Sequence, residues 1–62
     1  MNTKRMKEIK KENHLTNYQI SKRSGLHPSV IANILEGKVD NPKIETVKKL
    51  AEAMRIPVSE II

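Results

Sequence analysis

Residues 15–38 read LTNYQISKRSGLHPSVIANILEGK and carry the start and stop signals of two short helices. Thr16 and Gln19 fit a capping box, in which each side chain bonds to the backbone N–H of the other residue. A helix from about Asn17 to Ser24 should follow. Gly25 should end it, because glycine readily adopts the left-handed conformation that closes a helix. The first half of this stretch therefore predicts a helix and then a tight turn.

The second half begins another helix. Pro28 suits the first helical position, where a missing N–H costs nothing, and His27 occupies the N-cap before it. This helix should run to about Glu36 and stop at Gly37. Two short helices joined by residues 25–27 have the dimensions of a helix–turn–helix, in which the second helix can enter a major groove.

The rest of the chain also has helical rather than alternating periodicity. Residues 4–12 place apolar side chains on one face and charges elsewhere, and residues 44–54 form a fourth amphipathic segment. Residues 56–62 predict a closing turn of helix. We therefore expect an all-α fold, a compact five-helix arrangement in which residues 1–62 form a single domain. Its core should contain the apolar residues of these segments: Leu15, Ile20, Leu26, Ile31, Ile34, Val47, Leu50 and Met54.

The composition limits the class of protein. A chain of 62 residues has room for one small core, and it contains no cysteine, so disulfides and thiolate zinc sites are excluded. No apolar run approaches the ~20 residues of a membrane helix, and no apolar segment follows the basic N-terminus as in a signal peptide. We therefore expect a soluble, cytoplasmic protein without a second domain that senses a small molecule.

The positive charge is unevenly distributed. Lys and Arg number 12 against 7 acidic residues, which gives a net charge of +5, and the sequence pI is about 9.8. Residues 1–43 hold 9 basic and 4 acidic residues, whereas residues 44–62 hold 3 of each. This asymmetry suggests a polyanion partner, with an ordinary solvated surface as the alternative. Tyr18 is the only aromatic residue, which disfavours proteins that stack single-stranded bases on aromatic rings.

The helix expected at residues 28–36 has two unlike faces when residues are spaced ~100° apart. One face is aliphatic and should be buried: Val30, Ile31, Ile34 and Leu35. The other is small and polar: Ser29, Ala32, Asn33 and Glu36. Side chains that face base edges must hydrogen-bond or touch methyl groups, whereas phosphate neutralisation belongs to the periphery. The polar face is therefore predicted to read base pairs, with a solvated face as the alternative, and basic residues at its flanks should anchor it: Lys22, Arg23, Lys38 and Lys43.

Residues 5–62 resemble the phage-repressor/Cro-type (Xre-like) helix–turn–helix domain of bacterial and phage regulators. The residues that carry the likeness are Leu15-Thr16, Ser21, Gly25, Ile31, Gly37-Lys38, Asn41-Pro42 and Leu50-Ala51-x-x-Met54. The resemblance implies a lambda-repressor-like five-helix fold. It also implies sequence-specific binding of double-stranded DNA, often as a homodimer.

Four positions depart from the family pattern. Asn17 stands where Gln commonly contacts a phosphate, and Pro28 stands where a base-reading side chain is frequent. Ser21 replaces the usual Ala where the two motif helices cross closely, and its hydroxyl could bond to a carbonyl. Lys43 replaces a Ser or Thr cap on the fourth helix.

We therefore expect a transcriptional regulator, a repressor, with its helix–turn–helix motif at about residues 16–36. Four residues are expected to read bases: Pro28, Ser29, Ala32 and Asn33. Six are expected to bind phosphates: Asn17, Tyr18, His27, Lys38, Asn41 and Lys43. Asn33 should contact adenine, because an amide can bond to both N7 and N6, although a bond to a phosphate or to its own helix is the alternative.

The operator and the assembly follow from the same interpretation. The reading face offers no Arg or Lys for guanine, so we expect half-sites rich in A·T pairs. One motif reads few base pairs, and the resemblance favours a weak homodimer on a palindrome, formed through residues 55–62. Half-sites should then lie one helical turn, ~34 Å, apart.

Three other classes of function compete with this interpretation. Catalysis is not expected, because there is no phosphate-binding glycine loop and His27 and Ser29, two residues apart, should point to different sides. We likewise expect no metal site and no cofactor. A protein-interaction module of the same fold, such as an antitoxin or accessory regulator, is the main alternative, with Ile61 and Ile62 either on a partner surface or in the core. Binding to a membrane surface is disfavoured, because the core needs the apolar stripes.

Overall fold

The computed structural model describes residues 1–62 as four α-helices and one short 3-10 helix, without strands. The elements are α1 (Thr3–Glu12), α2 (Asn17–Ser24), α3 (Pro28–Leu35), α4 (Ile44–Met54) and η1 (Val58–Glu60). The expectation of an all-helical fold is confirmed, but the fifth helix is only a single 3-10 turn. Ile61 donates to the carbonyl of Val58 three residues earlier, and its own side chain turns into the core. The segment therefore ends before an α-helix can form.

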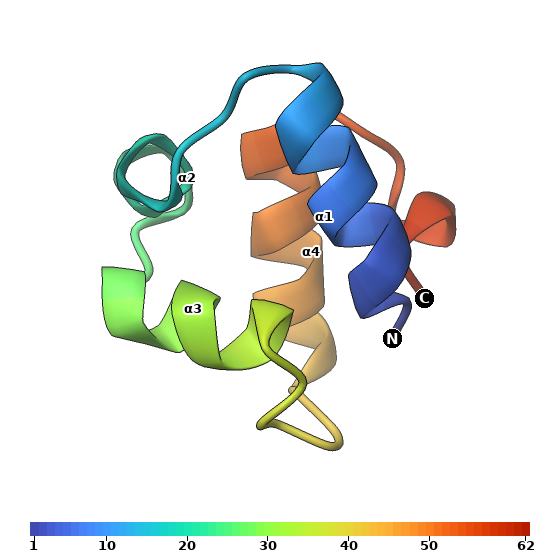
Figure 1. The fold of residues 1–62 in the computed structure, drawn as a ribbon. Coiled ribbons are helices and arrows are strands. Elements are labelled where there is room, and N and C mark those ends of the chain that lie inside the picture. Colours follow the sequence, from blue (N-terminus) through green and yellow to red (C-terminus); the bar gives the residue numbers. More distant parts are fainter.

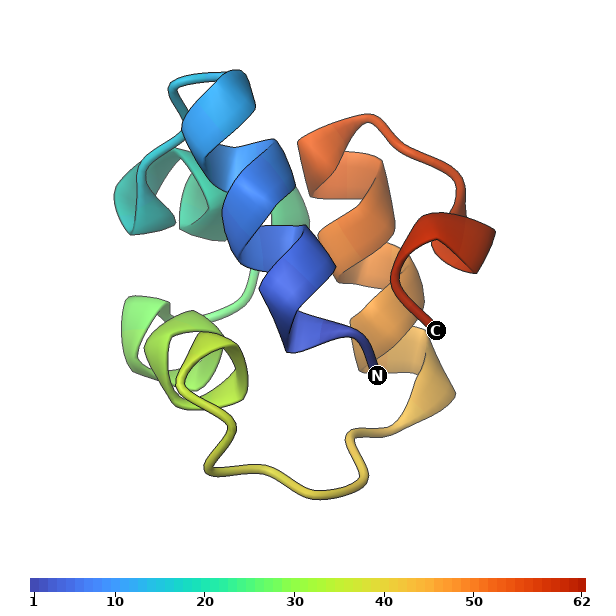
Figure 2. The ribbon, with the colours of Figure 1, turned by 45° about the vertical axis from the view of Figure 1, so that its right-hand side comes forward.

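The motif helices lie at a steep angle to each other, and α2 lies between α3 and α4 in the packing. In Figure 1, α2 is viewed down its axis, whereas α3 lies across the view below it. α2 packs against both α3 and α4, and α1 packs against α3. Figure 2 shows α1 crossing the front of the molecule between α3 and the C-terminal segment. This arrangement leaves the outer side of α3 uncovered.

The core lies between the four helices and contains no polar side chain. Six of the eight expected core residues are buried, whereas Leu15 and Leu26 are partly buried against the cluster. The buried residues are Met6, Ile9, Ile20, Ile31, Ile34, Leu35, Val47, Leu50, Ala51, Ala53, Met54 and Ile61. The complete burial of Ile61 assigns it to the core, so it is not available as a partner surface.

The expected helix boundaries of the motif are confirmed. The Gln19 N–H donates to Thr16 Oγ1 over 3.1 Å, and the Thr16 N–H donates to Gln19 Oε1 over 3.0 Å, which completes the capping box. Gly25 has a φ of 76°, in the left-handed region. The Ser21 hydroxyl donates to the carbonyl of Leu26, which is the carbonyl bond expected of it. This bond holds the turn in place between α2 and α3.

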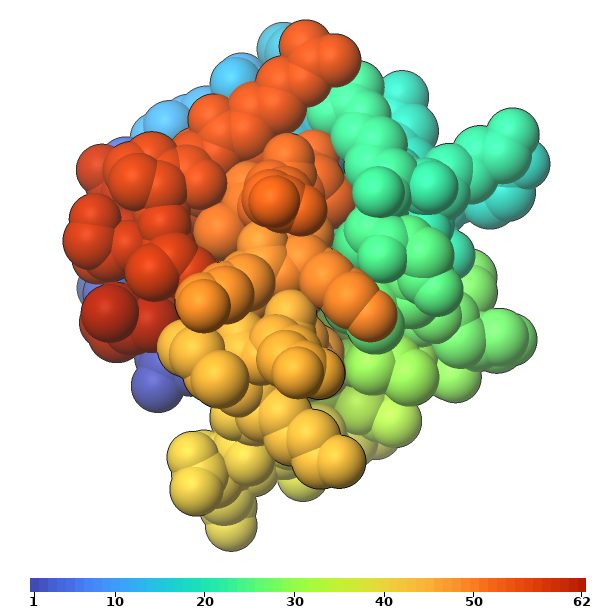
Figure 3. All heavy atoms as spheres, turned by 180° about the vertical axis from the view of Figure 1, so that it is seen from behind, coloured from blue at the N-terminus to red at the C-terminus, as the bar shows by residue number.

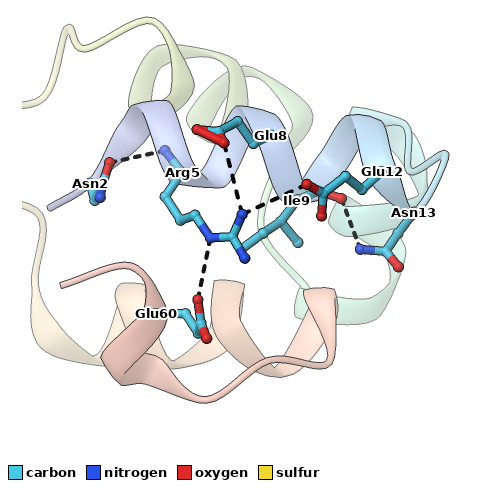
Figure 4. A network of polar contacts seen from close by, with 7 residues as sticks. All are labelled: Asn2, Arg5, Glu8, Ile9, Glu12, Asn13 and Glu60. Carbon is cyan, nitrogen blue, oxygen red and sulfur yellow. Dashed lines mark hydrogen bonds and ion pairs between the residues drawn. The ribbon is translucent and has the colours of Figure 1, made fainter.

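A polar network fastens the C-terminal segment to α1 (Figure 4). The Arg5 guanidinium lies 3.3 Å from Glu60 Oε2 and just under 4 Å from Glu8 and Glu12, at 3.9 and 3.8 Å. The backbone N–H of Asn2 donates to the carbonyl of Ile61 over 2.7 Å. Arg5 is therefore compensated by three carboxylates, and the ends of the chain lie side by side in Figures 1 and 2.

Candidate nucleic-acid interface

The outer side of α3 presents a small, uncharged surface. Pro28, Ser29 and Asn33 are exposed, Ala32 is half-buried, and Glu36 is exposed as the C-cap residue. The polar face expected from the sequence is thus turned outward. Its N-terminal end begins at the motif turn, and its C-terminal end leads into the loop before α4.

Val30 differs from the sequence expectation. The sequence pattern places Val30 on the aliphatic face together with three residues that are almost fully buried, yet 38% of its surface is exposed. The other three are Ile31, Ile34 and Leu35. Val30 lies at the edge of the aliphatic arc, next to Asn33 one turn later, and neither α1 nor α2 covers that edge. The outer surface of α3 therefore includes an aliphatic side chain that the sequence pattern did not assign to it.

The start of α3 is organised by His27. The Ser29 N–H donates to His27 Nδ1 over 3.1 Å, and Ser29 Oγ lies 2.7 Å from the same nitrogen. In the tautomer in which Nδ1 accepts the backbone N–H, the Ser29 hydroxyl also donates to Nδ1 and the ring proton is on Nε2. Ser29 can then only accept further hydrogen bonds, while Nε2–H is left as a donor.

The expectation that His27 and Ser29 point to different sides is therefore wrong. That rule applies to two residues within a helix, whereas His27 is an N-cap with extended backbone angles, φ −66° and ψ 142°. An N-cap side chain bends back toward the first free N–H groups. The contact serves as a helix cap, and both partners of Nδ1 belong to Ser29.

The side-chain amide of Asn33 makes no hydrogen bond within the chain. Its backbone carbonyl accepts from the Lys38 N–H over 3.0 Å, as part of the turn in which Gly37 has a φ of 76°. The predicted stop of α3 at Gly37 is thus confirmed. The amide of Asn33 remains exposed, with its donor and acceptor both unused.

The start of α2 presents two of the residues expected to bind phosphates. Asn17 Oδ1 is buried without a hydrogen-bond partner, whereas Nδ2 of the same amide is neither buried nor bonded. The amide therefore directs its donor outward, near the unpaired N–H groups of the helix start. Tyr18 is 63% exposed, and the Lys22 ammonium lies 5.2 Å from its ring centroid.

Three more of the residues expected to bind phosphates lie in the loop between α3 and α4. Lys38, Asn41 and Lys43 are all exposed. Lys38 Nζ lies 3.0 Å from Glu36 Oε2, in an exposed pair of the kind that contributes at most about 1 kcal/mol. Lys43 is the N-cap residue of α4, where its side chain makes no capping bond, and it takes part in no ion pair.

Arg23 does not belong to the flanking anchors expected for α3. Its Nη1 donates to the carbonyl of Ala53 over 3.3 Å, near the end of α4. Carbonyls in the last turn of a helix have no partner within the helix and carry negative partial charge, so they attract a guanidinium. Arg23 thus links α2 to α4.

The dimensions of this surface suit a groove. An α-helix with its side chains is about 10–12 Å in diameter, and the major groove of DNA is ~12 Å wide. The outer side of α3, a helix of 8 residues, can therefore enter such a groove. His27 lies at one end of α3, and the loop with Lys38 and Lys43 begins at the other. A hydrogen-bond donor and two cations thus flank the outer face of α3 at its two ends.

The molecule offers two surface hollows, and neither includes a residue of α3. One, of about 460 Å³, is lined by Met1, Ile62, residues 40–43 of the loop before α4, and Ile44 and Val47 of α4. The other, of about 270 Å³, is lined by Asn13, Leu15, Arg23, Met54, Arg55 and Ile56. The outer face of α3 is therefore not a pocket. No group of three or more His, Cys, Asp or Glu residues is arranged to hold a metal ion, and none of the helices is sufficiently long and apolar to traverse a lipid bilayer.

The comparisons with known proteins agree with this geometry. The chain is 40% identical over 52 residues to the HTH-type transcriptional repressor RghR of Bacillus subtilis (strain 168), which covers 84% of this chain and 38% of that protein. It is 32% identical over 57 residues to the uncharacterized HTH-type transcriptional regulator RghRB of the same organism, covering 92% and 41%. The chain thus spans about two fifths of the length of these relatives. No solved structure matches it, but a family model described as helix-turn-helix matches residues 6–61. The chain belongs to this helix-turn-helix family.

Proposed function

We propose that this chain is the DNA-binding part of a transcriptional repressor and places α3 in the major groove of double-stranded DNA. The observation that carries the proposal is the outer face of α3, which has no charge before its C-cap residue Glu36 and lies within a chain of net charge +5. A face of this kind suits base edges, which are read by hydrogen bonds and methyl contacts rather than by charge. The similarity to a protein named as a repressor supports the regulatory role.

Phosphate contacts in this proposal come from three places around α3. Asn17 and Tyr18 act from the start of α2, with the amide donor of Asn17 turned outward. His27 donates through Nε2. Lys38, Asn41 and Lys43 act from the loop after α3, where Lys38 exchanges its Glu36 partner for a phosphate. These contacts position the protein on DNA without sequence preference.

Base recognition in this proposal centres on Asn33, whose free amide can donate to N7 and accept from N6 of adenine. Ser29, whose hydroxyl proton bonds to His27, contributes only an acceptor, which suits the amino groups of adenine or cytosine. Pro28 and Ala32 offer apolar surface to thymine methyl groups. The preferred half-sites are therefore rich in A·T pairs.

The proposal includes a weak homodimer on a palindromic operator. The expected interface at residues 55–62 loses Ile61 to the core, but Ile62 is 66% exposed. Ile62 borders the larger hollow together with Met1 and Ile44, so the exposed apolar surface near the chain ends is continuous with the start of α4. A two-fold contact pairs this surface with itself. Residues 1–62 act in this scheme as one domain, in the cytoplasm and on the nucleoid.

Selection of bound sequences from a random duplex library tests the proposal. Recovered sequences should share an A·T-rich palindrome. Binding to that palindrome should survive excess competitor DNA and weaken steeply with added salt. Salt-dependent binding without any recovered consensus would contradict the proposal, and it would favour the protein-interaction module, for which the family fold is equally suited.

A further inference from the structure

We infer that Val30 is a specificity-determining residue that packs against the C5-methyl group of a thymine. The inference rests on the proposed function, because it requires α3 to lie in a major groove. It adds a side chain that neither the sequence pattern nor the set of expected base-reading residues contains.

The position of Val30 carries the inference. Around the axis of α3, Asn33 lies between Ser29 and Val30, so the outer face presents a hydroxyl, an amide and an isopropyl group side by side. An A·T pair presents adenine N7 and N6, thymine O4 and the thymine methyl in a similar row across the major groove. With the amide of Asn33 on adenine, Val30 lies on the side where a methyl group of the same or the next pair can be reached.

Val30 adds a third apolar group to this face beside Pro28 and Ala32. Ala32 is half-buried, whereas Pro28 is exposed and Val30 is 38% exposed. A β-branched side chain in a helix has one preferred rotamer, so little conformational freedom is lost on contact. Valine is also a weaker helix former than Ala, Leu or Lys, so helix propensity gives no reason to prefer it at this position.

Deoxyuridine supplies the sharpest test, because it differs from thymidine in base contacts only by lacking the C5-methyl group. On the selected operator, each thymine would be replaced in turn and the Kd of the wild-type chain measured. We expect a loss of about 3- to 10-fold at one or two positions, as for removal of one buried methyl contact. Val30→Ala should lose a similar factor on the thymine operator and nothing more on the deoxyuridine operator.

Two further variants keep the test interpretable. Val30→Thr has nearly the same shape and replaces one methyl by a hydroxyl, so it should show a reduced dependence on the thymine methyl while remaining folded. Val39, in the loop before α4, is the matched control because its exposure of 39% is nearly that of Val30. Val39→Ala should retain the full deoxyuridine effect.

The outcomes separate the two proposals. If deoxyuridine weakens Val30→Ala and the wild type equally at every position, the inference is wrong while the proposed function stands. If the wild type selects no duplex sequence at all, the proposed function fails and the inference fails with it. A deoxyuridine effect at one thymine that disappears in Val30→Ala and persists in Val39→Ala supports both proposals.

Discussion

The outer faces of α3 and α4 differ in how they meet solvent. α4 exposes two basic and two acidic residues, whose charges cancel: Glu45, Lys48, Lys49 and Glu52. Figure 3 shows α4 in the middle of one side of the molecule, not covered by another helix. The outer face of α3 has no charge before its C-cap residue. Each helix also exposes one aliphatic side chain, Val30 on α3 and Ile44 at the start of α4.

This difference bears on the interpretation of α3. The α4 face is rich in strongly hydrated groups, as is typical of a helix face that only meets water. The α3 face lacks them, although the chain has many charged residues to place there. The contrast favours a contact surface over an ordinary solvated face, and the predictions that follow test it by changing residues on each side.

The largest expected effect separates the buried from the exposed side of α3. Ile31 is fully buried, so Ile31→Ala should lower the free energy of unfolding by about 2–5 kcal/mol. Val30→Ala, one residue away, should change it by less than about 1 kcal/mol, since that site is partly exposed. Thermal and denaturant melts of both variants measure the two values. Equal losses would mean that the exposed side of α3 is not where the structure has it.

Asn33→Ala should leave stability nearly unchanged, because the amide is exposed and makes no bond within the chain. Its affinity for the selected operator should fall by roughly 1–3 kcal/mol, with relaxed preference at a single base pair. Lys48→Ala, on the α4 face, is the control and should bind as the wild type does. A loss that is uniform over all sequences would reassign Asn33 to a phosphate.

Lys43→Ser should change stability and DNA affinity in opposite directions. A serine N-cap on α4 can accept a free N–H of the first turn, which Lys43 does not do, so stability should rise by about 1 kcal/mol. Loss of a phosphate contact should weaken binding to all duplexes and reduce the salt slope by about one. Melting curves and titrations at several salt concentrations measure both; an unchanged salt slope would remove Lys43 from the interface.

Lys38→Ala should have the smallest effect on binding, because part of the gain from a phosphate contact is offset by the lost pair with Glu36. Affinity should fall by less than about 1 kcal/mol, equally for all sequences. Glu36→Gln should have the opposite effect and tighten binding, since Lys38 is then free. If Glu36→Gln instead weakened binding at one base pair only, Glu36 would be reading a base.

The helix starts and stops were the most predictable part of this molecule. Capping boxes, N1 proline and left-handed glycines act through neighbouring residues, so their signals are local and survive folding. The exposure of Val30 was not predictable in this way. The helical pattern of the sequence predicts which side of α3 is apolar. How many residues at the edges of that side become buried depends on how α1 and α2 pack against α3, and the sequence pattern of α3 does not contain this tertiary information.

Three other expectations from the sequence also differ from the structure or are decided only by it. Arg23 is expected to flank α3 because it lies next to the motif turn. In the structure its guanidinium instead donates to the carbonyl of Ala53, thirty residues later. The His27–Ser29 contact was missed because a spacing rule for helical residues was applied to a residue outside the helix. The sequence allows Ile61 either on a partner surface or in the core, and only the packing of the C-terminal segment against α4 and the chain start decides for the core.

The bond between the Asn2 N–H and the Ile61 carbonyl has a consequence for engineering. Because residues 2 and 61 are in contact, a peptide linker of a few residues could join the two ends without distorting the helices. Such a cyclic chain would lose less conformational entropy on folding and should resist exopeptidases. The join would lie on the opposite side of the molecule from the start of α3 (Figure 1), so it would leave the α3 surface free.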